Sequence, residues 1–354
     1  MEHHALSWAK WAFAVAGVTP LLAACSSNTG TNNAAEEFVE TKLVADSGGL
    51  GAATLDSALK NPWGMAFGPT GILWVSDNHS GTSTLYDTTG AKRSLVVAIP
   101  SSTSATGGAP TGIVYNPTSD FVIPGAGKAL FIFAGEDGVL SAWNATSNAQ
   151  RVADRSANAA VYKGLALAAN GAANFLFATD FKQNGVDVFD ASFQFVKSFT
   201  DSTLPVGYAP FGIQALGSQL YVTFAKQLGP DNEDDEPGVG NGYIDIFNTD
   251  GTVAKRFAAR GTLNSPWAVA LAPTGYGAFS HDLLVGNFGD GRIGAYDPST
   301  GSFVDFLRDA AGAPIVIDGL WGLTFGPGAD SSALFFTAGP SGESHGLLGR
   351  LMPK

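Results

Sequence analysis

The chain is short of cysteine, of charged residues and of basic residues, and each shortage argues against a class of protein. Its single cysteine, Cys25, leaves no possibility of an internal disulfide. Charged residues make up 14% of the 354 positions, and acidic residues outnumber basic ones to give a formal net charge of −12. An acidic surface without a Lys/Arg cluster repels phosphate backbones, which argues against nucleic acid as a partner.

Long hydrophobic runs are also lacking. The most apolar stretch, residues 11–24, is too short to span a bilayer and is interrupted by Pro20. Lys10 precedes this stretch as a weakly positive n-region. Residues 1–24 are therefore predicted to be a signal peptide rather than part of the fold.

The cysteine lies where a lipid anchor would be attached. Residues 22–25 read Leu-Ala-Ala-Cys and resemble a bacterial lipobox, in which small residues fit the peptidase and the thiol of Cys25 takes the lipid. Residues 25–37 are small and polar, typical of a flexible tether. We therefore expect an exported lipoprotein of a bacterial cell envelope, periplasmic or on the outer surface. The alternative is an ordinary secretory signal cleaved near Ala24.

Glycine, by contrast, is abundant, with 45 residues, and it marks an internal repeat. Six short runs align on one glycine or alanine, at spacings of 48, 52, 48, 56 and 54 residues. The aligned positions are Gly64, Gly112, Gly164, Gly212, Ala268 and Gly322. Each run leads an apolar strand, and three further short strands with glycine-containing turns follow in most units. Four antiparallel strands per repeat are typical of a propeller blade, so the sequence predicts an all-β, six-bladed β-propeller over residues 38–354.

The two ends of the chain predict how the ring closes. The sixth unit stops after three strands, the last of them within residues 347–354. Residues 38–46 form a strand without a blade of their own. Adding that strand to the outside of the last blade closes the ring and covers an exposed edge. The alternative is a disordered or separately packed N-terminal strand.

The repeat core, PWG…PTG.LWVSD…G…YD, resembles NHL-type propeller repeats. The runs at residues 61–87, 161–168, 207–227, 238–251 and 281–301 are similar to a family of uncharacterised exported bacterial six-bladed propellers. That resemblance implies a fold and an exported location, but no established activity and no catalytic residues. Relatives in the wider superfamily include lactonases and lyases, which is an analogy of fold alone.

The topology of a blade predicts which residues share a face. Loops that enter the innermost strand and loops between the second and third strands open on the same side, which we call the loop face. Near the central channel on this face the repeat places six side chains, those of Trp63, Thr111, Lys163, Phe211, Trp267 and Trp321. The aromatic ones are a possible stacking platform for a sugar or another flat ligand. The alternative is that they wedge between blades as core. A cation–π contact between Lys163 and Trp321 requires a channel narrowed to about 6 Å.

Two groups of residues on the loop face are candidate metal ligands. One is an acidic insertion that could wrap Ca²⁺, although its spacing does not match an EF-hand. Its carboxylates are those of Asp231, Glu233, Asp234, Asp235 and Glu236. The alternative is a solvated acidic loop.

The other candidate metal ligands come from blades one and six, which are neighbours in a closed ring. His79 and His345 lie in loops of these blades, with Asp77 and Glu343 close in sequence, and this group could hold a transition metal. Asn61 and Asp318 flank two of the aligned runs and are further candidates for an ion at the channel mouth. Solvent-facing histidines are the alternative interpretation.

Two functions follow from these observations, and the sequence does not decide whether the protein is an enzyme. The first is a membrane-tethered binding or scaffolding module, a monomer that takes a protein or glycan ligand on the loop face. The second is a metal-dependent hydrolase or lyase of the lactonase type. The six side chains near the channel are poor in metal ligands and no nucleophile-elbow motif is present, which favours the first. No cofactor other than a possible Ca²⁺ is expected.

Overall fold

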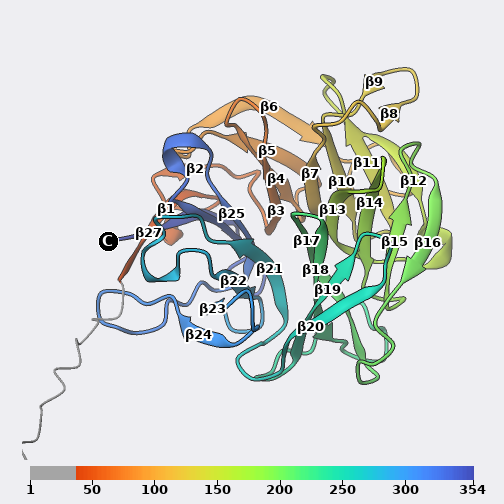
Figure 1. The fold of residues 1–354 in the computed structure, drawn as a ribbon. Helices are drawn as coiled ribbons and strands as arrows, with labels where there is room; N and C mark the ends of the chain where they lie inside the picture. Colours follow the sequence, from red (N-terminus) through yellow and green to blue (C-terminus); the bar gives the residue numbers. More distant parts are fainter. Residues whose placement is uncertain (1–36) are drawn as a thin grey trace, which may run out of the picture. The chain divides into compact units, whose positions relative to one another are not determined.

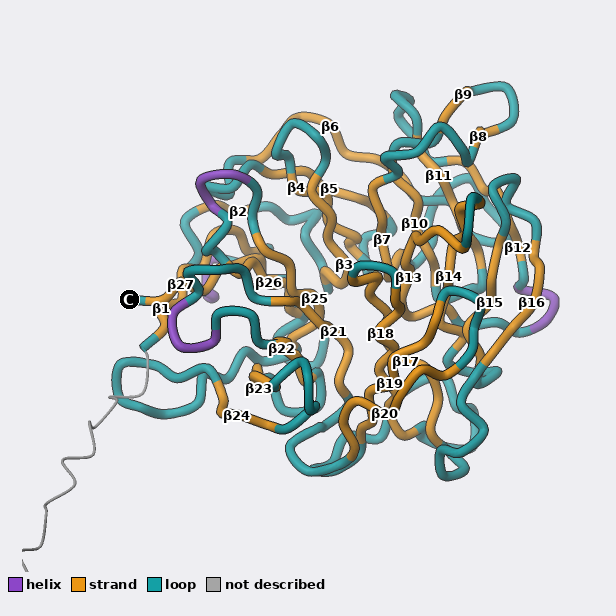
Figure 2. Tube along the Cα trace, in the orientation of Figure 1, coloured by secondary structure: helices purple, strands orange, loops and turns teal. Residues whose placement is uncertain are grey.

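The computed structural model describes residues 37–354, and within that range it confirms the six-bladed β-propeller (Figure 1). The predicted signal peptide, most of the tether and Cys25 lie outside the described residues. Six sheets of mainly antiparallel strands surround an axis, and from residue 62 onward the chain visits them in sequence order (Figure 2). No helix among residues 37–354 is long and apolar enough to cross a membrane.

The strands of the first three blades follow the predicted repeat. Blade 1 comprises β3 (Pro62–Phe67), β4 (Leu73–Asp77), β5 (Thr82–Tyr86) and β6 (Lys92–Ala98). Blade 2 comprises β7 (Pro110–Tyr115), β10 (Phe131–Gly135), β11 (Val139–Trp143) and β12 (Gln150–Asp154), with a small hairpin of β8 (Val122–Ile123) and β9 (Gly127–Lys128) inserted. Blade 3 comprises β13 (Tyr162–Asn170), β14 (Ala173–Asp180), β15 (Gly185–Phe189) and β16 (Phe195–Phe199).

The last three blades complete the ring. Blade 4 comprises β17 (Tyr208–Leu216), β18 (Gln219–Lys226), β19 (Gly242–Asn248) and β20 (Val253–Ala259). Blade 5 comprises β21 (Pro266–Leu271), β22 (Leu283–Asn287), β23 (Ile293–Tyr296) and β24 (Phe303–Phe306). Blade 6 comprises β25 (Leu320–Phe325), β26 (Leu334–Ala338) and β27 (Leu347–Pro353) from the C-terminus.

The ring closes as predicted, through the N-terminal strand. β1 (Phe38–Ala45) pairs antiparallel with β27, with Phe38 opposite Pro353 and Ala45 opposite Leu347. An unpredicted short strand, β2 (Thr54–Leu55), then pairs parallel with β1 and becomes the outermost strand of this five-stranded blade. β1 therefore begins on the face opposite the loop face and ends on the loop face, where the chain enters β3.

Apolar cores lie between neighbouring blades rather than within one. One buried cluster joins Trp74 of blade 1 to Phe131 and Trp143 of blade 2, and another joins Tyr162 of blade 3 to Ile132 and Leu140 of blade 2. Because a blade is a single sheet, each of its faces must be covered by the next sheet around the ring. The cores therefore require all six blades together.

The aligned glycines allow neighbouring inner strands to approach very closely. A Cβ atom on Gly322 would lie 2.6 Å from the Trp63 carbonyl oxygen, and one on Gly212 would overlap the carbonyl oxygen of Trp267. In three blades a buried threonine on the second strand reinforces this contact. Thr179, for example, accepts a hydrogen bond from Gly164 N at 2.7 Å and donates one to the Phe211 oxygen of the next blade at 2.9 Å.

We predict that Gly212→Ala destabilises the propeller by about 3 kcal/mol, because the added methyl group would push blade 5 away from blade 4. Urea denaturation measures this change. Gly49→Ala is the matched control, since a Cβ there meets nothing nearer than 3.8 Å and should change stability little. Equal stability of the two variants would contradict the role given to the glycine ring.

Candidate functional site

The aromatic residues of the six aligned runs meet on the axis instead of wedging between blades. The Trp63 and Trp321 rings are stacked with centroids 3.5 Å apart, and Trp267 packs edge-on against both at 6.1 and 5.7 Å. Phe211 and Phe288 contact Trp321 from blades 4 and 5. We call this group the tryptophan plug. Its three indoles are between 2% and 8% exposed, so they do not form the accessible stacking platform that the sequence suggested.

Hydrogen bonds hold two of the three indoles in place. Trp321 Nε1 donates to Asn61 Oδ1 at 3.1 Å, and Trp267 Nε1 donates to the Lys163 carbonyl oxygen at 3.2 Å. Trp63 Nε1 is buried without a hydrogen-bond partner among the described residues. The plug closes the axis at the loop-face end of the inner strands.

Lys163 lies on the plug and is the one charged residue among the six that directly precede the aligned positions. Its ammonium lies 5.1 Å from the centroid of Trp63, so the predicted cation–π contact exists but with Trp63 and not with Trp321. Lys163 Nζ also lies 2.5 Å from Glu136 Oε1 and 3.6 Å from Asp234 Oδ1. Burial acts to lower the pKa of Lys163, but the nearby carboxylates outweigh it and raise the pKa. The side chain therefore stays charged at neutral pH.

Four carboxylates surround this lysine, and we call them the carboxylate cluster: Glu136, Asp234, Asp235 and Glu343. Asn78 Nδ2 donates to Glu136 Oε2 at 2.9 Å and fixes that side chain. Burial, followed by the negative charge of Glu136, raises the pKa of Glu343 to about 7. Sequence reasoning predicted the shared face, but it did not predict that these four groups meet around Lys163.

The acidic insertion does not gather its carboxylates around one point. Glu233 pairs with Lys182 at 2.6 Å, and Glu236 pairs with Lys226 at 2.7 Å. Asp234 turns toward Lys163, Asp235 is buried and Asp231 is exposed. Across residues 37–354 no group of three or more His, Cys, Asp or Glu side chains is arranged to hold a metal ion. This geometry therefore lends no support to the calcium hypothesis.

The histidine group is also dispersed among separate partners. His79 Nε2 lies 3.3 Å from Asn61 Nδ2, whereas His345 Nδ1 lies 3.1 Å from the carboxylate of Asp46. Asp318 accepts a hydrogen bond from the Ser341 backbone at 2.8 Å. Asn61 is instead occupied by the Trp321 indole. These residues serve to fix loops of blades 1 and 6 in the described part of the chain.

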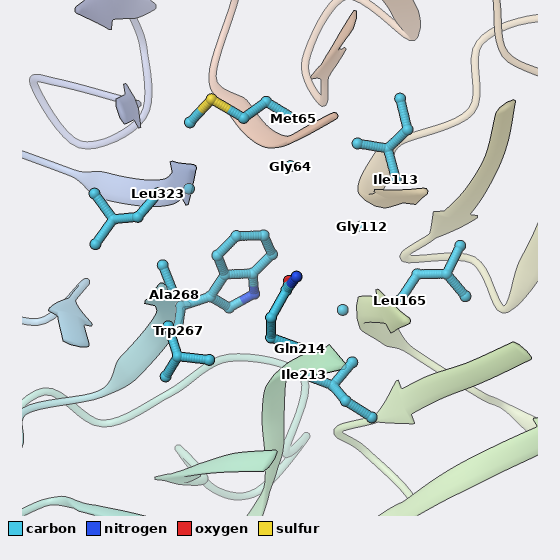
Figure 3. A pocket seen from close by; sticks show the side chains of 13 residues that line it. Gly64, Met65, Gly112, Ile113, Leu165, Ile213, Gln214, Trp267, Ala268 and Leu323 are labelled. Carbon is cyan, nitrogen blue, oxygen red and sulfur yellow. The ribbon is translucent and has the colours of Figure 1, made fainter. Parts of the chain in front are cut away.

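The other end of the axis opens into a funnel on the face opposite the loop face. About 810 Å³ of empty space, continuous with bulk solvent, narrows toward the glycine ring. One aliphatic residue follows each aligned position in its lining, namely Met65, Ile113, Leu165, Ile213, Val269 and Leu323. Figure 3 shows the Trp267 indole and the Gln214 side chain projecting toward the axis between them. The lining carries no charged side chain, and the inner strands also present their unpaired backbone edges there. The two ends of the axis therefore differ sharply in charge.

We predict that the melting temperature falls between pH 5 and pH 8, and less steeply in Glu343→Gln. The folded-state pKa of Glu343, about 7, lies above its ordinary value of 4.5, so the folded state keeps a proton that the unfolded state loses as pH rises. The contribution of Glu343 to the free energy of unfolding is therefore largest below about pH 4.5 and is lost as the pH rises through 7. Asp245, with a pKa raised by burial to about 7, acts in the same direction.

At pH 8 the Glu343→Gln variant should therefore melt about 2 °C above the unmodified protein, and the difference should vanish near pH 5. Differential scanning fluorimetry across this range measures it. Asp250→Asn, a substitution of an exposed carboxylate, is the control that should leave the slope unchanged. Parallel curves for Glu343→Gln and the unmodified protein would contradict the raised pKa.

Solved structures of other proteins share the fold of this chain. No known family profile matches it. Solved structures of similar fold include virginiamycin B lyase from Staphylococcus aureus, with a TM-score of 0.52, 15% identity, and coverage of 90% of this chain and 100% of the lyase. A luciferin-regenerating enzyme aligns with a TM-score of 0.55 and 12% identity, covering 89% of this chain and 95% of the enzyme. Identities this low show the propeller fold and nothing about activity.

Two curated proteins of Acanthamoeba polyphaga mimivirus are much more similar in sequence. "Uncharacterized protein R648" is 35% identical over 322 residues, which cover 85% of this chain and 76% of the relative. "Uncharacterized protein L690" is 34% identical over 322 residues, which cover 85% of this chain and 82% of the relative. These relatives are viral, so the expected bacterial, exported origin finds no support in them. Similarity of this extent shows that the chain belongs to the same protein family as R648 and L690.

Proposed function

We propose that the propeller is a binding or scaffolding module that takes its ligand on the loop face. The observation that carries this proposal is the carboxylate cluster, which lies at the centre of that face. The tryptophan plug closes the axis beneath it, so a ligand would rest on the face rather than enter the ring. Asp234, whose side chain is 79% exposed, keeps the cluster open to solvent.

Exposed apolar side chains on the same face support the proposal. Val206, in the loop entering β17, is fully exposed, and Val239, in the loop between β18 and β19 that carries the acidic insertion, is 80% exposed. Leu228, at the start of the same loop, is half exposed. All three belong to loops of blade 4. Apolar tips beside a charged centre are typical of a surface that a partner covers.

The alternative is a metal-dependent hydrolase or lyase of the lactonase type. One observation favours it, because a carboxyl group that titrates near pH 7, as Glu343 does, could serve as a general acid or base. The described residues do not supply a metal-ligand group beside it. The binding module is therefore the better supported of the two functions.

The direction of β1 determines where a tether would join the propeller. Phe38 pairs with Pro353, so the chain enters the propeller on the face opposite the loop face. A lipid anchor at Cys25 would therefore be joined to the propeller at the start of β1, at the opposite end of that strand from the loop face.

The hypothesis of a lipid anchor at Cys25 leads to a separate prediction. Cys25→Ser should leave the thermal stability of the propeller unchanged and move the protein from the membrane fraction to the soluble fraction, because the thiol that takes the lipid is gone. Fractionation of a bacterial expression host, followed by immunoblotting, measures the distribution. Retention of the variant in the membrane pellet would count against lipid anchoring.

Binding on the loop face is tested with glycan and peptide arrays probed with the purified protein. We expect hits whose affinity falls at least about tenfold in a Val206→Ser, Val239→Ser double variant, because two apolar contacts with the ligand are lost. Both positions are exposed, so folding should not change. Isothermal titration calorimetry with the hits measures the affinities.

Two variants on the opposite side of the molecule serve as controls. Leu271→Asp changes a half-exposed residue at the end of β21, and Gln214→Lys places a charge in the funnel. Neither should weaken a loop-face ligand. Hits lost in Gln214→Lys would place the ligand in the funnel and overturn the loop-face site, and the absence of any hit would contradict the binding module itself.

A further inference from the structure

We propose that the carboxylate cluster binds a second cation beside Lys163, the guanidinium or ammonium group of a partner's arginine or lysine side chain. This inference rests on the proposed function and names the chemistry of the ligand. The partner is then a protein or peptide with an exposed basic side chain, rather than a neutral glycan.

The first argument is an imbalance of charge. Lys163 contributes one positive charge, and its shortest ion pair is with Glu136 at 2.5 Å. Its contact with Asp234 is longer, at 3.6 Å, and its interaction with Glu343 is purely electrostatic. Three carboxyl groups are therefore left to share a cation that is already paired. Grouped like charges of this kind favour an added cation.

The second argument does not depend on the balance of charge and concerns a buried hydrogen-bond acceptor, the carboxylate of Asp235. Asp235 is 8% exposed, and its Oδ2 atom makes no hydrogen bond of normal geometry among residues 37–354, although the Ser265 hydroxyl lies close enough to lower the pKa of this carboxyl group. The charge of Lys163 lowers the pKa of Asp235, and the charge of Asp235 raises the pKa of Glu343, so this carboxyl group lies near the cluster. A buried carboxylate oxygen left unpaired costs free energy, which a donor supplied by a ligand would recover.

The third argument concerns Glu343, which the backbone holds in place. Its φ of 65° lies in the left-handed region that few side-chain-bearing residues adopt. The charged groups that act on it come from three other parts of the fold: Glu136 after β10, Lys163 in β13, and Asp234 and Asp235 before β19. A strained residue in a cluster of like charges is a common sign of a ligand site.

The arrangement suits an organic cation better than a metal ion. The carboxylates come from separate loops and do not meet at metal–ligand distances anywhere in the described chain. A guanidinium group, by contrast, offers five N–H donors in a flat fork and can contact several acceptors that lie apart. Its long stem also lets it enter a cluster that is open to solvent on the side of Asp234.

The experiment uses acetyl-arginine amide as the probe, with acetyl-citrulline amide as its neutral isostere. Isothermal titration calorimetry at low salt should show the arginine probe binding at least about tenfold more tightly than the citrulline probe. Glu343→Gln and Asp235→Asn should each weaken the arginine probe about fivefold or more. Asp234→Asn, at a largely exposed side chain, provides the same test if Asp235→Asn fails to fold. Asp250→Asn is the control and should leave the affinity for the arginine probe unchanged.

Proton release gives a second readout. Because Glu343 is partly protonated near pH 7, cation binding should displace its proton, so titrations in buffers of different ionisation enthalpy should give different apparent enthalpies. Affinity for the arginine probe should rise between pH 6 and pH 8. Glu343→Gln should abolish both the buffer dependence of the enthalpy and the rise of affinity with pH. If Glu343 had only a structural role, this substitution would leave both effects in place.

The outcomes separate this inference from the proposed function. Equal binding of arginine and citrulline probes, or binding unchanged by the cluster variants, would overturn the cation site. CaCl₂ that binds and competes through the same residues would also overturn it, in favour of a metal. Array hits that are neutral and insensitive to Glu343→Gln would refute the cation site and leave the binding module standing. Binding of the arginine probe without any array hit would support the cation site and contradict the binding module.

Discussion

The close approach of neighbouring inner strands at the glycine ring is the constraint on which the rest of the structure depends. A Cβ atom on Gly64 would lie 2.5 Å from the Thr111 carbonyl oxygen of the next blade, so a side chain at most of these positions would force the blades apart. The narrow axis brings residues of different blades within contact distance. Trp63 and Trp321, one position before two of the ring members, therefore stack on each other and close the channel.

Closure of the channel changes the chemistry of the loop face. Because the tryptophan plug fills the axis, Lys163 cannot extend into a water-filled channel and lies on the Trp63 ring instead. A buried ammonium requires a carboxylate partner, which Glu136 supplies from the second loop of blade 2. The acidic insertion of blade 4 and Glu343 of blade 6 then meet over the same point. Charge accumulates at one end of the axis, while the funnel at the other end stays neutral.

Much of the fold could be predicted because each blade of a propeller is formed by one continuous repeat of the sequence. The spacing of Gly64, Gly112 and their equivalents predicted the number of blades, and the missing strand at the C-terminus predicted the closure by residues 38–46. The site was less predictable. The alignment of the repeats placed Trp267 near the central channel, but it could not say whether the ring would be exposed or buried, since that depends on the radius of the channel. The pairing of Glu233 with Lys182 likewise depends on how two loops fold.

The amino-acid sequence by itself determined the class of fold, the number and order of the blades, the strand that closes the ring and the set of loops that share a face. These properties follow from the period of the repeat and from backbone preferences within each unit. Only the tertiary structure decided that the tryptophans form a plug, that Lys163 lies on Trp63, and that Glu136, Asp234, Asp235 and Glu343 converge. Those contacts join blades that are far apart in sequence, and their distances are set by the packing of the whole ring.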